Sequence, residues 1–123
     1  MLMQSSPAEA YRKIDFDARV AGGSARDLVL VCFEQFILAL DAALAADERC
    51  DNQGKSAGLT RALAALTALQ LGVDRASSVA PALLDLYRAA RQAVLDAAIA
   101  FDPAVMRSVR SDFSEIAAAL NLA

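Results

Sequence analysis

The chain has 123 residues, of which 57% are hydrophobic and 22% are charged, and its formal net charge is −3. This length suits a single domain with one core. The acidic balance, with no basic run longer than Arg12-Lys13, argues against a nucleic-acid-binding protein. Histidine, the commonest general base and metal ligand, is absent, so the composition also argues against an enzyme, a metal site or a cofactor.

Alanine dominates the composition, with 29 residues against 3 prolines and 5 glycines. Because alanine is the best helix former and β-branched residues are sparse, we predict an all-α fold. Cys32 falls in an apolar stretch and Cys50 in a polar one, so we expect both thiols to stay apart and reduced. The N-terminus lacks a basic start followed by an apolar run, and the chain is therefore predicted to be cytoplasmic.

Residues 1–23 are polar and interrupted by Pro7 and Gly22-Gly23, which predicts a flexible N-terminal arm with room for one short helix near Tyr11. We expect residues 24–123 to form the bundle domain. Ser24, with an acid three residues later, resembles a capping box and predicts a first helix over residues 25–46. The polar, glycine-containing stretch over residues 47–56 predicts a loop.

A second helix is predicted over residues 56–71, with leucines at helical spacing and Gly72 as its stop. The third helix has Ser78 as a candidate cap and Pro81 in its first turn. Its apolar face comprises Leu83, Tyr87, Ala90, Val94, Ala97 and Phe101.

Asp102-Pro103 reads as a cap followed by proline at the first helical position, which predicts the start of a fourth helix. The apolar side chains of this helix are Val109, Phe113, Ile116 and Leu120. Four helices with short connections predict an antiparallel up-down four-helix bundle.

The first helix is unusually apolar: the stretch LVLVCFEQFILAL, over residues 28–40, has only two polar side chains. Thirteen residues are too few to span a bilayer, which needs about 20. The face expected to turn toward the bundle comprises Val29, Phe33, Phe36 and Leu40. A narrow polar stripe of Asp27, Glu34 and Asp41 is bordered by Leu30 and Ile37 on one side and by Val31 and Leu38 on the other.

Two interpretations of these flanking residues stay open. The helix is the central one and packs on several sides, or the flanking residues are covered by the N-terminal arm, a second copy or a partner helix. The alanine-rich helices favour the second interpretation, because small side chains leave shallow grooves that admit another helix.

The pair Ala10-Tyr11 in AEAYRK precedes SARDLVLVCFEQFILALDAA, and LTRALAALTALQLGVD, LYRAARQAVLDAAIAFD and VRSDFSEI follow in this order. The order and spacing of these motifs resemble the flagellar secretion chaperone family FliS. The similarity covers roughly residues 10 to 120. Phe113 stands where the family usually has tryptophan, and Ala89, Gln92, Ala93 and Ala98 also depart from its pattern.

The resemblance implies a non-enzymatic chaperone that binds the disordered C-terminal segment of flagellin, blocks premature polymerisation and supports export. Implied partners are flagellin and the export machinery, and a homodimer is a further option; nucleic acid and membrane insertion are not expected. The alternative is a self-associating structural or regulatory bundle without a secreted client. The expected partner-binding residues are Ala10, Tyr11, Leu30, Val31, Ile37, Leu38 and Tyr87, with a place in the bundle core left open for Tyr87.

Overall fold

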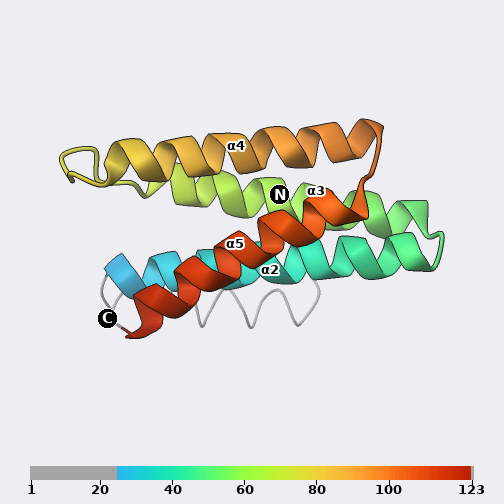
Figure 1. Cartoon of the computed structure of the whole chain (residues 1–123), viewed down its shortest axis with the longest axis horizontal. Coiled ribbons are helices and arrows are strands. Elements are labelled where there is room, and N and C mark those ends of the chain that lie inside the picture. Colours follow the sequence, from blue (N-terminus) through green and yellow to red (C-terminus); the bar gives the residue numbers. More distant parts are fainter. Residues whose placement is uncertain (1–24, 123) are drawn as a thin grey trace, which may run out of the picture.

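The computed structural model describes residues 25–122, and within this range it contains four helices and no strand (Figure 1). They are α2 (Ala25–Glu48), α3 (Asn52–Leu71), α4 (Ala80–Ile99) and α5 (Pro103–Leu122). The predicted arm over residues 1–23, with its short helix near Tyr11, and the predicted cap Ser24 lie outside the described residues.

Successive helices run in opposite directions, as Figure 1 shows. Helix α2 packs against α3 and α5, and α4 packs against the same two helices, so α2 and α4 are diagonal neighbours. Helix α5 crosses α2 obliquely rather than running parallel to it. The predicted all-α, up-down four-helix bundle is therefore confirmed.

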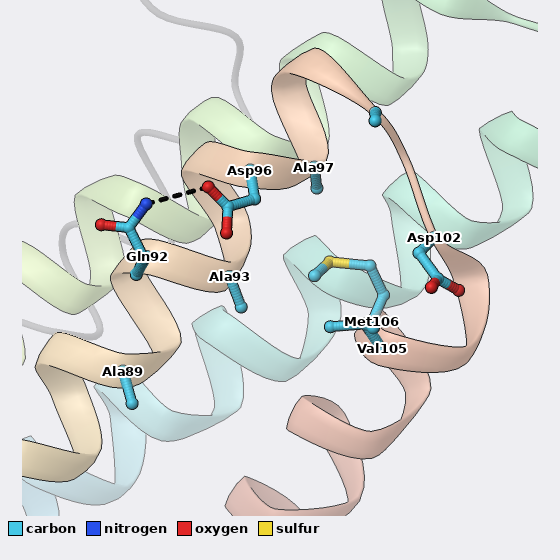
Figure 2. A pocket seen from close by; sticks show the side chains of 9 residues that line it. Ala89, Gln92, Ala93, Asp96, Ala97, Asp102, Val105 and Met106 are labelled. Atoms are coloured by element: carbon cyan, nitrogen blue, oxygen red, sulfur yellow. Dashed lines mark hydrogen bonds between the residues drawn. The ribbon is translucent and has the colours of Figure 1, made fainter.

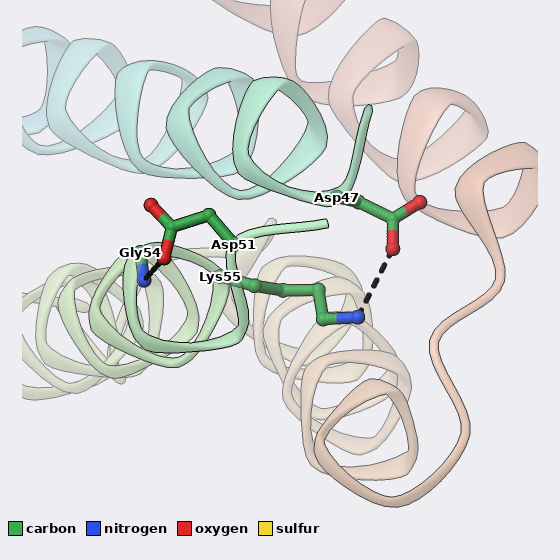
Figure 3. A network of polar contacts seen from close by, with 4 residues as sticks. All are labelled: Asp47, Asp51, Gly54 and Lys55. Carbon is green, nitrogen blue, oxygen red and sulfur yellow. Dashed lines mark hydrogen bonds and ion pairs between the residues drawn. The ribbon is translucent and has the colours of Figure 1, made fainter. Parts of the chain in front are cut away.

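The connection between α2 and α3 is shorter than the predicted loop over residues 47–56, because α2 continues to Glu48 and α3 already begins at Asn52. Asp51 is the N-cap of α3, and its side chain accepts a hydrogen bond from the Gly54 N–H at 2.9 Å (Figure 3). Cys50 has a φ of 56°, a left-handed conformation that reverses the chain in this short turn. The prediction failed because a polar, glycine-containing segment is compatible with a capped first helical turn.

The other helix ends follow the sequence signals more closely. Gly72 ends α3 as its C-cap, and Asp102 caps α5 by accepting the Ala104 N–H at 3.0 Å. The predicted cap at Ser78 is wrong: Val79 precedes α4 and has no side-chain cap, although Pro81 does lie in the first turn. The third helix also ends earlier than predicted, so Phe101 lies in the turn after α4.

The centre of the bundle is an aromatic cluster contributed by α2, α4 and α5. The Phe36 and Phe113 rings are 4.4 Å apart between centroids, and Phe33 lies 5.2 Å from Phe113 and 6.2 Å from Tyr87. All four side chains are at most 1% exposed. Such pairs contribute about 0.5–1.5 kcal/mol each beyond the apolar area that they bury.

Helices α2 and α3 approach each other at backbone distance. A Cβ atom built on Gly58 of α3 would lie 2.9 Å from the Ala39 carbonyl oxygen and 2.9 Å from the Ala43 nitrogen of α2. The facing positions carry glycine and alanine, so no side chain holds the two backbones apart. This pair is the most tightly packed unit of the bundle, and the other two helices are added to it.

Polar contacts join the remaining helices near the surface. Arg91 of α4 donates to the Gln70 amide oxygen and the Thr67 hydroxyl of α3. At the end of the bundle shown in Figure 3, the Lys55 Nζ atom pairs with Asp47 at 3.0 Å and lies 4.9 Å from the Phe101 ring centroid. Lys55 thus connects the α2–α3 turn to the α4–α5 turn.

Among the described helices, α2 includes a stretch, Asp27–Glu48, that is long and apolar enough to cross a membrane by length and composition alone. Residues 28–40 alone are too short to span a bilayer, but alanines extend the apolar helix toward Glu48, so length does not exclude a membrane span. The core helix of a bundle passes the same test. Here Phe33, Phe36 and Leu40 are fully buried against the other helices.

Candidate partner-binding surface

One edge of the polar stripe on α2 is covered by α5. Asp41 forms an ion pair with Arg110 of α5, and this pairing raises the pKa of the Arg110 guanidinium. Ile37, one turn before Asp41, is partly buried and packs against the core. Leu30 is also only partly exposed. Near Ile37 and Asp41, this edge of α2 is therefore engaged within the bundle, in line with a central helix packed on several sides.

The opposite edge of α2 points outward. Leu38 is 59% exposed, whereas Val31, seven residues earlier on the same face, is 8% exposed. Leu38 therefore leaves apolar area in water that the described helices do not bury. Of the two predicted flanks, this one offers surface to a partner.

A groove runs between this edge of α2 and helix α3. It has a volume of about 280 Å³ and is lined by Val31, Cys32 and Gln35 from α2 and by Arg61, Ala64, Ala65 and Ala68 from α3. We call it the α2/α3 groove. Leu38 lies three residues after Gln35, and Leu71, 83% exposed, lies three residues after Ala68. Two exposed leucines thus extend the apolar surface beyond a groove whose α3 wall carries three alanines.

The electrostatic character of the α2/α3 groove is nearly neutral. Cys32 forms part of its wall, and burial raises the pKa of its thiol, so that the thiol stays protonated. Arg61 contributes one positive charge at the rim. A surface of this kind can bury apolar side chains and has no group suited to proton transfer or to metal binding.

Tyr87 does not belong to the surface. Its side chain is 1% exposed, and desolvation together with the nearby Cys32 raises the pKa of the phenol to about 12. It lies on the same face of α4 as Ala90 and Val94, which are also buried. Tyr87 was expected to contact a partner, but in the structure it is a core residue of the bundle. Ala10 and Tyr11 lie outside the described residues.

Sequence reasoning named Leu38 and Val31 but not the α3 wall of the groove. The wall consists of Arg61, Ala64, Ala65 and Ala68, none of which has a distinctive motif. The signal that could have found them was the alanine content of α3, because outward alanines beside an apolar neighbour form a shallow groove. Within the described residues, no group of three or more potential metal-ligating side chains occurs.

The described residues thus form a four-helix bundle with a groove between α2 and α3 and with two exposed leucines near it. The family model described as flagellar protein FliS matches residues 7–121, and the chain belongs to this family. The match includes Ala10 and Tyr11 as well as the bundle. No curated protein matches the chain. The family implies a flagellar export chaperone that binds flagellar proteins, and it is not a family of enzymes.

Proposed function

We propose that this chaperone acts in the cytoplasm and binds the C-terminal segment of flagellin, which folds into helix along the α2/α3 groove. The observations that carry the proposal are the α2/α3 groove, to which α3 contributes three alanines, and Leu38, which is 59% exposed three residues after Gln35 of the groove. Occupation of this surface shields the assembly segment of the client, which prevents premature polymerisation and keeps the subunit fit for export. Release to the export machinery then requires only that a surface contact be broken.

The physical basis of such binding is burial of apolar area. Burial contributes about 25 cal/mol per Å², and the cost of ordering the client must be subtracted from this gain. The α3 alanines at 64, 65 and 68 let a client backbone come close, so that its side chains reach into the α2/α3 groove beside Val31. No catalytic group is needed for this activity, in keeping with a family of chaperones.

The N-terminal arm contributes Ala10 and Tyr11 to the proposal. The arm covers apolar surface in the free protein and gives way to the client, and Tyr11 suits this role because its ring buries area while its hydroxyl stays hydrated. Ile37 supports the client surface through its packing against the core, and Leu30, half-buried on the same edge of α2, adds a further apolar contact for the client.

The test compares two charge insertions at exposed apolar positions. Leu38→Asp removes a contact worth about 1.5–3 kcal/mol when buried, so capture of the flagellin C-terminal segment should fall at least about tenfold. Ile99→Asp, at a 90% exposed position on α4, is the matched control and should bind as the unaltered chain does. Both variants should melt within a few degrees of the unaltered protein.

The same exposed leucines also fit the alternative, a bundle that pairs with a second copy. Sedimentation of the unaltered chain and of Leu38→Asp separates the two functions. A dimer that Leu38→Asp dissociates, together with no capture of the flagellin segment, would favour self-association over chaperone activity toward flagellin.

A further inference from the structure

A second groove lies between α4 and α5, where the two helices are held together least. Its volume is about 400 Å³ (Figure 2). Helix α4 contributes Ala89, Ala93 and Ala97, its C-cap Ala100 also lines the groove, and α5 contributes Val105 and Met106. Val105 is 42% exposed. Because α5 is inclined across the bundle and α4 presents alanines toward it, their side chains do not fill the space between them.

The charged side chains that line this α4/α5 groove are all acidic. Asp96 and Asp102 lie among its lining residues, which include no lysine or arginine. Asp112 is exposed and follows Val105 by seven residues, so it lies on the same face of α5. Gln92 donates to the Asp96 carboxylate at 2.9 Å, which orients that group without neutralising it. Figure 2 shows Gln92 and Asp96 together on α4.

Several of the arginines on these two helices are engaged elsewhere. Arg91 of α4 is turned toward α3, where it binds Gln70, and Arg110 of α5 is turned toward α2, where it binds Asp41. Arg88 pairs with Asp85 on α4. The carboxylates of the groove therefore favour a positively charged partner.

We propose that the α4/α5 groove docks a helix from a second protein, one that presents small apolar side chains to the alanines and lysine or arginine along its flanks. This partner goes beyond the proposed binding of flagellin. Helix pairs α2–α3 and α4–α5 form opposite sides of the bundle, so a client segment in the α2/α3 groove leaves the second groove accessible. A bundle with both grooves filled would connect the client to the second protein.

A second copy of this chain is the weaker occupant. Two α4/α5 grooves facing each other would bring Asp96 and Asp102 of one copy against the same carboxylates of the other. Like charges across an interface oppose association. A basic helix, in contrast, pairs each of these groups, and the pairing weakens as salt screens it.

The probe is a synthetic helical peptide of alanine and leucine on one face with lysines along both flanks, labelled for fluorescence anisotropy and titrated with the full chain. We expect saturable binding that weakens between 50 and 500 mM salt, and binding at least about tenfold weaker for the same peptide with glutamate in place of lysine. Equal affinity of the two peptides would overturn the proposal.

Two variants locate the site. Asp96→Lys should weaken binding of the lysine peptide about threefold to tenfold, whereas Glu48→Lys, the same change of charge at an exposed carboxylate at the end of α2, should leave it within about twofold. Ala89→Phe, which fills the groove from an exposed position, should also weaken binding. Equal effects of the two lysine variants would show a response to net charge alone and would refute the groove as the site.

The flagellin segment distinguishes this proposal from the client site. Ala89→Phe should bind the flagellin C-terminal segment normally, and Leu38→Asp should bind the lysine peptide normally. Loss of peptide binding in Leu38→Asp would place the peptide in the α2/α3 groove and refute a second site, whatever the outcome for flagellin.

Discussion

Replacing Gly58 by alanine tests the closest contact in the bundle. In a helix interior, alanine is normally more stable than glycine by about 0.5–1 kcal/mol. At Gly58, however, the new Cβ would lie 2.9 Å from two backbone atoms of α2, at Ala39 and Ala43. Backbone atoms cannot rotate away as a side chain does, so α2 and α3 must separate.

The magnitude follows from two opposing effects. Overpacking a tight core costs about 1–3 kcal/mol, and the gain in helix propensity offsets up to about 1 kcal/mol of this. We therefore expect Gly58→Ala to lower the free energy of unfolding by about 1–2 kcal/mol. For a domain of this size, with an unfolding entropy of about 2.1 cal/mol/K per residue, that loss lowers Tm by about 4–8 °C.

Gly72→Ala is the matched control. Gly72 has a φ of −85°, and the nearest atom to its added Cβ would be the Ala68 carbonyl oxygen at 3.4 Å, an ordinary contact. This substitution should stabilise the protein by about 0.4–1 kcal/mol, because it restricts the unfolded chain. Urea denaturation followed by circular dichroism at 222 nm measures both changes. If Gly58→Ala stabilises the protein as Gly72→Ala does, the two backbones are not in contact.

Three further outcomes are expected from the described residues. In the native protein, Cys50 should react with a thiol reagent at once and Cys32 only on unfolding, because one is exposed and the other buried; equal rates would contradict this. The pKa of Tyr87 is raised to about 12 in the folded protein, above the ordinary value of about 10 that applies to the unfolded chain. The free energy of unfolding should therefore be unaffected by Tyr87 below about pH 10 and should fall between about pH 10 and 12. In urea titrations, Tyr87→Phe should flatten this decline. Arg110→Gln, which removes the Asp41–Arg110 ion pair, should lower the free energy of unfolding by at most about 1 kcal/mol at low salt, because both side chains are roughly 40% exposed. A larger loss would mean that this pair is the main attachment of α5.

The sequence was sufficient to predict the helices, because their signals are local. Alanine content, leucines at helical spacing and the Asp102-Pro103 start all act within one or two turns, and the fold bears them out. The α2–α3 turn was misjudged for the same reason. Composition between residues 47 and 56 indicates a loop, whereas the Asp51 side chain caps a helix that begins inside this stretch.

The candidate surface was less predictable, because exposure depends on where neighbouring helices lie. Leu38 and Ile37 are adjacent and equally apolar in sequence, yet Leu38 points into solvent while Ile37 packs against the core. They differ in the face of α2 on which they lie: Ile37 is on the side of Asp41, which Arg110 of α5 reaches. The α4/α5 groove was likewise not foreseen, since it arises from the inclination of α5 and not from any motif.

The most direct test of the proposed chaperone function is calorimetric titration of the full chain with the C-terminal segment of flagellin from the same organism, at several temperatures. We predict saturable binding with a clearly negative heat-capacity change, because a disordered segment folds as it buries apolar surface. Leu38→Asp should weaken this binding at least about tenfold. An absence of saturable binding, or binding that Leu38→Asp leaves unchanged, would contradict the assignment of the α2/α3 groove as the flagellin site.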